Sequence, residues 1–244
     1  MARLPVAMIG GPMGLPESDW SYLTKLGTAA LAHEDPDFAL RDSAAETLVA
    51  SHREIFAYFQ EVVMARKRAG AGSGSLIDIM LTMENDGLRT SAGSVVANCY
   101  SLLLGATATV PQIPNWVLLE LAGTDVLERW SNQPLLWRTG IEEAIRWASP
   151  TSHSMRYATR DVVLGGRSIR SGEAVVAWLA SANRDESQFQ DAHQFMIDRK
   201  TNRHVSFGIG PHYCVGHNLA RQAVRNIFET LFSCYKDIVP AGRR

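Results

Sequence analysis

The stretch FGIGPHYCVG, residues 207–216, places one cysteine in a glycine-rich loop, and the helical pattern HNLARQAVRNIFETLFSCY follows directly. Gly208, Gly210 and Gly216 allow positive φ angles or the close approach of another group. The start of a helix directs free N–H groups at the residues before it, which favours a thiolate over a thiol. The stretch therefore predicts a negatively charged sulfur on Cys214, acting as a nucleophile or as a metal ligand.

Three chemistries fit such a cysteine, beside the common role of a lone cysteine as a small buried apolar residue. A zinc site could combine Cys214 with His212 and His217, but the paired C-x-x-C spacing of zinc sites is missing. A cysteine hydrolase would need a base and an orienting partner from elsewhere in the chain. The third chemistry is a single axial thiolate on haem iron.

The composition is that of a soluble globular protein, with 244 residues, 46% apolar residues and a net charge of −1. The near-neutral balance gives no reason to expect a nucleic acid or an anionic membrane as partner. The first residues do not have the pattern of a signal peptide, so we expect a cytoplasmic protein. Three cysteines, an odd number, argue against a disulfide framework.

Helical spacing of apolar residues dominates the first two thirds of the chain. It predicts a helix over residues 43–68, a flexible connector over residues 70–75, and a short helix capped by Ser75. A long helix is expected from Thr90 to Leu121, interrupted by Pro111 and Pro114. Because residues 100–109 are apolar nearly all round, we expect this helix to be buried.

The pattern changes in the last third. A helix is predicted over residues 135–147, before Pro150. Residues 160–180 indicate short strands, with Gly165 and Gly166 forming a hairpin turn. Residues 183–211 are polar and aperiodic, and a loop of that length is usually functional. The predicted fold class is mainly α with a small β portion.

The stretch FGIGPHYCVGHNLAR resembles the haem-ligand loop of the cytochrome P450 family, whose pattern is F-G-x-G-x-H-x-C-x-G followed by a helix. Every fixed position of that pattern is present in this chain. The resemblance implies that Cys214 is the axial thiolate ligand of the iron in haem b (iron protoporphyrin IX). It also implies that Phe207, Gly208 and His212 bind the cofactor, with His212 at a propionate.

Two further stretches resemble family landmarks. The segment EEAIRW is similar to the family's E-x-x-R helix, where Glu143 and Arg146 share one helix face at i, i+3. In the family this pair is buried and contacts a later arginine, which matches Arg199. Arg156 matches the position that contacts a haem propionate; its alternative role is a strand arginine that faces water.

The segment SLLLGATATV resembles the family's central helix. Gly105 and Ala106 would leave room for dioxygen, and Thr109 matches the catalytic threonine that hydrogen-bonds it. The alternative for Thr109 is a hydrogen bond back to its own helix. Ala108 stands where the family usually has an acid that helps to deliver protons, so Thr109, water or the substrate would supply that relay.

The resemblance covers nearly the whole chain but not the whole family fold. It implies a single, partial cytochrome P450 domain over residues 1–244, truncated at both ends. Its expected parts are helices in 1–69, a loop, a short helix and the central helix in 70–122, the E-x-x-R helix in 135–147, the β region in 150–180, the irregular and haem-ligand loops in 183–213, and the last helix in 214–235.

The resemblance implies a haem-thiolate monooxygenase that oxidises a small organic substrate with dioxygen. Electrons would come from a separate ferredoxin-type partner, because no nicotinamide or flavin fingerprint is present. Four basic residues near the cysteine could face such an acidic donor, or form a solvated run of charge, namely Lys200, Arg203, Arg221 and Arg225. The alternative is an inactive remnant or a haem-binding or interaction subunit, and a second chain could supply the missing N-terminal part.

Overall fold

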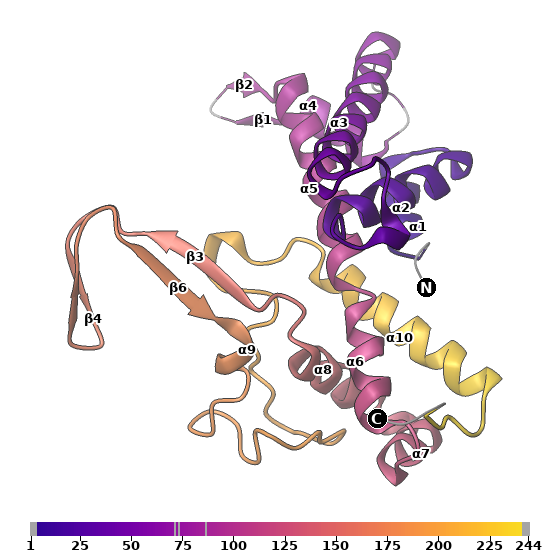
Figure 1. Cartoon of the computed structure of the whole chain (residues 1–244), viewed down its shortest axis with the longest axis vertical. Coiled ribbons are helices and arrows are strands. Elements are labelled where there is room, and N and C mark those ends of the chain that lie inside the picture. The colour runs from indigo at the N-terminus through magenta and orange to yellow at the C-terminus, as the bar shows by residue number, and fades with distance from the viewer. Residues whose placement is uncertain (1–3, 71, 73, 86, 241–244) are drawn as a thin grey trace. The chain divides into compact units, whose positions relative to one another are not determined.

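The computed structural model describes residues 4–70, 72, 74–85 and 87–240 (Figure 1). The chain divides into two compact units, residues 1–111 and residues 112–244. Helices make up most of the described residues, and the strands are short, as the sequence predicts for a mainly α fold with a small β portion.

The first unit is a helical bundle with one small hairpin. Its elements are α1 (Leu4–Met13), α2 (Glu17–Leu31), η1 (Pro36–Phe38), α3 (Ala44–Ala69), α4 (Leu76–Thr82), β1 (Glu84–Asn85), β2 (Leu88–Arg89) and α5 (Ala92–Thr109). The core is formed by apolar residues of the five helices, among which Leu23, Ile55 and Phe59 are almost or wholly inaccessible to solvent.

Serine side chains fix the starts of three helices in this unit. Ser43, Ser75 and Ser91 each accept a hydrogen bond from the backbone N–H three residues later, at 3.2, 3.3 and 3.1 Å. Such caps satisfy N–H groups that have no partner inside the helix. They confirm the helix predicted over residues 43–68 and the cap at Ser75. The connector predicted between them includes residues 71 and 73, which lie outside the described residues.

The long helix expected from Thr90 to Leu121 is divided in the structure. Helix α5 ends at Thr109, and α6 (Gln112–Leu121) begins after Pro111. Pro114 lies in the first turn of α6, where the missing N–H of proline has no helical partner to lose.

The prediction that this helix is buried, made because residues 100–109 are apolar nearly all round, is wrong. Of these ten residues only Leu103 is buried, while Ser101 and Gly105 are exposed. Helix α5 packs through one stripe, formed by Val95, Cys99 and Leu103. The pattern of apolar residues treats glycine and alanine as core, but Gly105 is exposed and Ala106 is only partly buried against the core.

The second unit combines four longer helices with two strand pairs. It contains α6, α7 (Asp125–Asn132), η2 (Pro134–Leu136), α8 (Trp137–Ala148), β3 (His153–Tyr157), β4 (Val162–Leu164), β5 (Arg167–Ile169), β6 (Ala174–Trp178), α9 (Leu179–Ala182), η3 (Gly210–His212) and α10 (His217–Cys234). Its core gathers apolar residues of α6, α7, α8 and α10 around the fully buried Trp130.

Two boundaries in this unit differ from the expected ones. Helix α8 begins at Trp137 rather than at residue 135, because residues 134–136 form a separate 3₁₀ turn. The last helix begins at His217 rather than at Cys214. The cysteine therefore lies in the loop, three residues before the helix.

The β region consists of two antiparallel strand pairs. Strand β3 pairs with β6, and β4 pairs with β5 through Leu164 opposite Arg167. Gly165 and Gly166 join β4 to β5 with φ angles of 55° and 78°, which confirms the predicted tight hairpin. Figure 1 shows the β3–β6 ribbon extending away from α8 of the same unit. Residues 183–209 form neither helix nor strand, as predicted.

One run of the chain, Ala92–Leu121, is long and apolar enough to cross a membrane by length and composition, and 28% of its most apolar window is buried. Core helices of soluble proteins pass the same test.

Candidate functional site

Helix α8 carries a buried ion pair. Arg146 donates from Nε and Nη2 to the two carboxylate oxygens of Glu143, at 2.8 and 2.7 Å. Both side chains are fully shielded from solvent. The i, i+3 spacing brings the groups onto one helix face, and the two parallel hydrogen bonds fix their orientation.

Arg199, from the irregular segment after the β ribbon, joins the same carboxylate. Its Nε donates to Glu143 at 3.0 Å, and its Nη1 donates to the Gln190 carbonyl at 2.5 Å. The backbone N–H of Met196 and the side-chain amide of Asn202 also donate to Glu143, at 2.9 and 3.1 Å. The structure thus brings together three residues that are 3 and 53 positions apart in the sequence.

The cluster holds two arginines but one carboxylate, and hydrogen bonds stabilise the unequal charges. Burial by itself raises the pKa of Glu143, but the hydrogen bonds from Arg146 and Arg199 outweigh burial and lower it. The second positive charge is shared with main-chain carbonyls, since Arg146 Nη1 donates to Asn183 at 2.6 Å and to Ala192 at 2.9 Å. The cluster therefore ties the irregular segment to α8.

Asn183 is a positioning residue that the sequence analysis missed. Its side-chain amide donates to Ser149 Oγ at 2.7 Å and to Ser206 Oγ at 2.8 Å, while its Oδ1 accepts from the Val205 N–H at 2.8 Å. Asn183 is fully buried. These bonds anchor the chain immediately before Phe207. In the sequence, Asn183 stands out only as a polar residue that follows an apolar strand and a short turn.

The glycine-rich loop has the backbone that its sequence predicts. Gly208 and Gly210 adopt φ angles of 72° and 82°, a region that disfavours other residues. The Cys214 N–H donates to the Phe207 carbonyl at 2.9 Å, which closes the loop on itself. Cys214 is a free thiol and is partly accessible. Phe207, Gly208, His212 and Cys214 therefore lie within one closed loop.

Exposed apolar side chains lie near Cys214 in the sequence. The exposed fractions are 76% for Ile209, 83% for Val215 and 39% for Leu219. A β-carbon added at Gly210 would meet no atom within 4 Å. A partly accessible thiol among exposed apolar side chains and open backbone suits a flat apolar group that binds through a metal–sulfur bond.

The other predicted residues lie on separate elements. Arg156, on β3, is exposed and opposite Val175 of β6, and its Nη1 donates to the Met155 carbonyl at 2.8 Å. Thr109 is the last residue of α5, in the first unit, and its hydroxyl donates to the Gly105 carbonyl at 2.8 Å. This is the backbone bond that the sequence analysis gave as the alternative for this threonine.

The zinc alternative finds no support in the side-chain positions. Within residues 4–70, 72, 74–85 and 87–240, no three His, Cys, Asp or Glu side chains are grouped so that they could hold a metal ion. Two of the histidines near Cys214 have other partners. His217 Nδ1 lies 2.8 Å from Arg221 Nη1, and His204 Nε2 lies 3.1 Å from Glu142.

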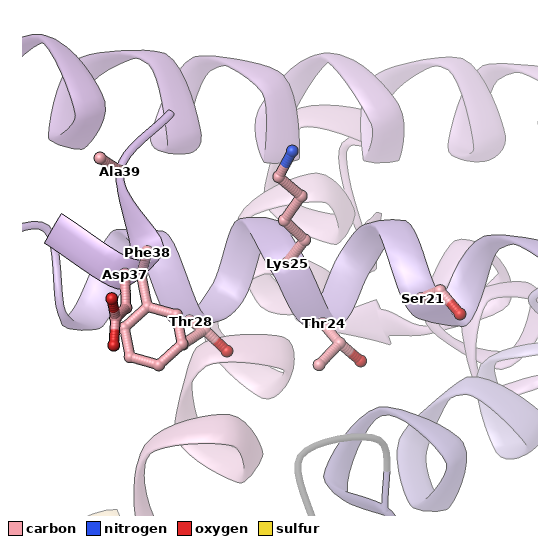
Figure 2. Close-up of a pocket in the computed structure, with 7 residues that line it drawn as sticks. All are labelled: Ser21, Thr24, Lys25, Thr28, Asp37, Phe38 and Ala39. Carbon is pink, nitrogen blue, oxygen red and sulfur yellow. The ribbon is translucent and has the colours of Figure 1, made fainter. Parts of the chain in front are cut away.

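A surface hollow of about 380 Å³ lies in the first unit, between α2 and η1 (Figure 2). Its lining is formed by Ser21, Thr24, Lys25, Thr28, Asp37, Phe38 and Ala39. Figure 2 shows the Lys25 amine directed away from Asp37 and Phe38. None of the predicted site residues lines this hollow, and its short polar side chains form no convergent reactive group. The hollow therefore adds no residue to the candidate site at the cysteine loop.

Comparison with known proteins covers the segment that contains this loop. A family model described as Cytochrome P450 matches residues 131–242. The chain is 32% identical over 242 residues to cytochrome P450 NovI of Streptomyces niveus, covering 99% of this chain and 58% of that protein. It is 31% identical over 233 residues to linalool 8-monooxygenase of Pseudomonas putida, covering 94% of this chain and 56% of that protein.

Solved structures agree with these relatives. The ligand-free structure of cytochrome P450 TbtJ1 superposes with a TM-score of 0.84 and 28% sequence identity, covering 99% of this chain and 63% of that chain. The chain thus spans a little more than half the length of the curated relatives it matches.

Proposed function

The chain belongs to the cytochrome P450 family, and from this membership we propose that it binds haem b through Cys214 and acts in the monooxygenation of a small organic molecule. The observation that carries the proposal is the closed loop around a free, partly accessible cysteine. Haem iron ligated by a thiolate supplies the activation of dioxygen. The protein's part is to hold the cofactor, orient the substrate and direct protons.

The residues of the loop fit this cofactor. Ile209 and Val215 of the loop and Leu219 at the start of α10 expose apolar surface, and burying that surface against the porphyrin face would be favourable. Arg156 and His212 are exposed. As a cation and a hydrogen-bond donor, they suit the two propionate groups. Phe207 and Gly208 would contact the ring from the start of the loop.

We assign proton handling to Thr109. Its hydroxyl can keep its bond to Gly105 as donor and still accept, or it can turn and donate to dioxygen. Ala108 cannot carry a proton, so water, the substrate or Thr109 completes the relay. Gly105 and Ala106 add little side-chain volume next to it, which would leave room for dioxygen.

The structure changes which cations could face an electron donor. Arg221 is paired with Glu142, and Arg225 is paired with Glu229. Lys200 and Arg203 are exposed and are the better candidates to meet an acidic ferredoxin-type partner. We expect the protein to act in the cytoplasm. Since the chain spans a little more than half of its relatives, a second polypeptide could complete the substrate pocket.

One relative is named linalool 8-monooxygenase. Similarity to a named monooxygenase favours a catalytic role over the alternative of an inactive remnant. The substrate class that we propose is a small, largely apolar organic molecule. Apolar ligands suit a pocket lined by apolar side chains and fixed by few polar groups.

The test is the spectrum of the carbon monoxide complex. The chain is purified with ferric haem b, reduced chemically and exposed to carbon monoxide. A thiolate ligand gives a strongly red-shifted Soret band, and Cys214→Ala is expected to abolish it. Cys234→Ala, which changes an exposed cysteine on α10, is the matched control and should keep the band. If the wild-type chain takes up no haem, the proposal is wrong.

A further inference from the structure

Helix α8 carries a second carboxylate, Glu142, beside the buried Glu143, and it has different partners. Arg221 of α10 donates from Nε and Nη2 to the two oxygens of Glu142, at 2.6 and 3.0 Å. His204 Nε2 lies 3.1 Å from the same carboxylate. The side chains of Glu142 and Arg221 are 24% and 30% exposed, and that of His204 is 3% exposed. This half-buried cluster uses none of the residues of the Glu143 network.

Arg221 also contacts the first residue of the cysteine loop. The carbon at the centre of its guanidinium lies 4.6 Å from the centre of the Phe207 ring. That position suits a cation–π interaction. Arg221 Nη1 lies 2.8 Å from His217 Nδ1, and the rings of His217 and Tyr213 are 4.9 Å apart. One guanidinium thus links α8, the start of α10 and the loop.

Phe207 transmits this arrangement to the cysteine. Its carbonyl accepts the hydrogen bond of the Cys214 N–H at 2.9 Å, so the backbone of Phe207 and that of Cys214 are joined across the loop. The ring of Phe207 also lies 5.7 Å from the ring of His204. Two members of the Glu142 cluster therefore contact the residue to which Cys214 is hydrogen-bonded.

The pairing is strong because the carboxylate stays charged. Burial by itself raises the pKa of Glu142, but hydrogen bonds from His204 and Arg221 lower it to about 2. A bidentate arginine–carboxylate pair is stronger than a pair of neutral hydrogen bonds and fixes both planes. Partial burial also reduces screening by salt.

We propose that Glu142 and Arg221 are positioning residues that hold the Cys214 loop in the geometry needed to ligate iron. Glu142 fixes the guanidinium, the guanidinium fixes Phe207, and Phe207 fixes the amide of Cys214. The consequence at the iron rests on the proposed function, whereas the effect on the loop is a property of the chain itself. Arg221 accordingly holds the Cys214 loop and does not take part in docking a redox partner.

The first experiment measures amide hydrogen exchange in peptides covering residues 205–217 of the full chain without haem. Glu142→Gln and Arg221→Gln should each raise the exchange rate about tenfold or more, the change expected when a charge-assisted hydrogen bond is lost. The double variant should exchange little faster than either single variant, because both remove the same contact. Glu229→Gln, which breaks the exposed pair with Arg225 on the same helix, is the control and should match the wild type.

Arg221→Lys keeps the charge but not the bidentate geometry, so it should give an intermediate exchange rate. It also serves if the glutamine variants do not fold. The loss of one such hydrogen bond should change the exchange rate by much more than about twofold. If the exchange rate of Glu142→Gln stays within about twofold of the wild-type rate, the proposal is overturned.

The second experiment records the carbon monoxide spectrum of the same variants with haem. Glu142→Gln should lower the fraction of bound haem that shows the thiolate band, and Arg221→Lys should recover part of it. A role in stability alone would lower the amount of bound haem without changing that fraction. Faster exchange with an unchanged fraction would overturn the effect at the iron. If the wild type itself lacks the band, the proposed function fails, and the exchange rates alone decide whether the loop is tethered.

Discussion

Arg146 and Glu143 form a bidentate pair on α8 with no solvent access to either side chain, at 2.8 and 2.7 Å. Arg199 binds the same carboxylate at 3.0 Å. Removing one partner from a buried pair leaves the other charge without compensation, which costs far more than the net stabilisation by the pair. Glu143 is therefore the residue of the second unit whose loss should cost the most stability.

Glu143→Gln should lower the free energy of unfolding by about 3–5 kcal/mol, because two buried guanidinium groups lose their common anion. Urea unfolding of the wild type and the variant measures this difference. Glu229→Gln, in the exposed pair with Arg225, is the matched control and should cost less than about 1 kcal/mol. Equal losses in the two variants would show that the buried carboxylate has no special role.

The acid stability of the chain should depend on Glu142. Its pKa is about 2, against 4.5 for an ordinary glutamate. A carboxyl group with a lowered pKa stabilises the fold above its unfolded pKa, and that stability is lost as the pH falls toward the folded pKa. The free energy of unfolding should thus fall between about pH 4.5 and about pH 2, and less steeply in Glu142→Gln.

Urea midpoints taken at intervals from about pH 6 to about pH 3 test this expectation. Glu143 also has a lowered pKa, and it is present in both proteins, so the difference between the two curves reports Glu142. Parallel curves would contradict the assignment of the charge to the pair with Arg221.

Two adjacent glycines in α1 should respond differently to alanine. A β-carbon at Gly10 would lie 2.5 Å from Trp20 Nε1, whereas one at Gly11 would meet no atom within 4 Å. Gly10→Ala should therefore destabilise the first unit by about 1–3 kcal/mol through overpacking. Gly11→Ala should change its stability little, because the gain in helix propensity is opposed by contact of the new β-carbon with the ring of Pro12, the next residue of α1.

Both substitutions remove backbone freedom from the unfolded chain, so the difference between them compares the contact with Trp20 at Gly10 with the contact with Pro12 at Gly11. Thermal unfolding of the two variants side by side measures it. A stabilising Gly10→Ala would mean that Trp20 moves aside at little cost.

The hydroxyl of Thr109 should matter for turnover and not for stability. Thr109→Ala removes a bond to the carbonyl of Gly105, which carries little stability in a helix, so the unfolding free energy should change by less than about 1 kcal/mol. If the hydroxyl directs a proton to dioxygen, its loss should raise the hydrogen peroxide released per electron pair consumed by about tenfold or more.

Thr107→Ala is the matched control for Thr109→Ala. Thr107 makes the same kind of bond, to the Leu103 carbonyl at 2.8 Å, on the same helix. Peroxide release that rises equally in both variants would assign the effect to the helix and remove Thr109 from the proton relay.

Local sequence patterns predicted the helices and turns that depend on interactions between residues close together in the sequence. Ser43 and Ser75 cap helices because their partners are three residues away, and Gly165 and Gly166 make a hairpin because glycine tolerates their φ angles. The burial of α5 could not be predicted in the same way. Apolar periodicity shows which face could be covered, but it does not show whether a neighbour covers it.

The clusters around α8 depend on contacts between distant segments. The resemblance to a family suggested that Glu143 meets Arg199, but no pattern pointed to Glu142 and Arg221, which are 79 residues apart. Glu142 resembles any charged residue on a helix surface, and Arg221 resembles a solvated cation. Their pairing follows from the path of the irregular segment and the loop, which sequence spacing does not encode.

The two arginines of the Glu143 network donate mainly to main-chain oxygens in the irregular segment. The acceptors are the carbonyls of Asn183, Gln190, Asp191, Ala192 and Gln194. A carbonyl is present whatever the side chain, so point substitutions at the exposed residues Gln190, His193 and Gln194 should accumulate more freely in evolution than at Ala192, which is buried, or at Asp191, which has a φ angle of 50°. An inserted or deleted residue would shift every acceptor carbonyl at once. We therefore expect the amino acids of this segment to vary among homologues while its length stays constant.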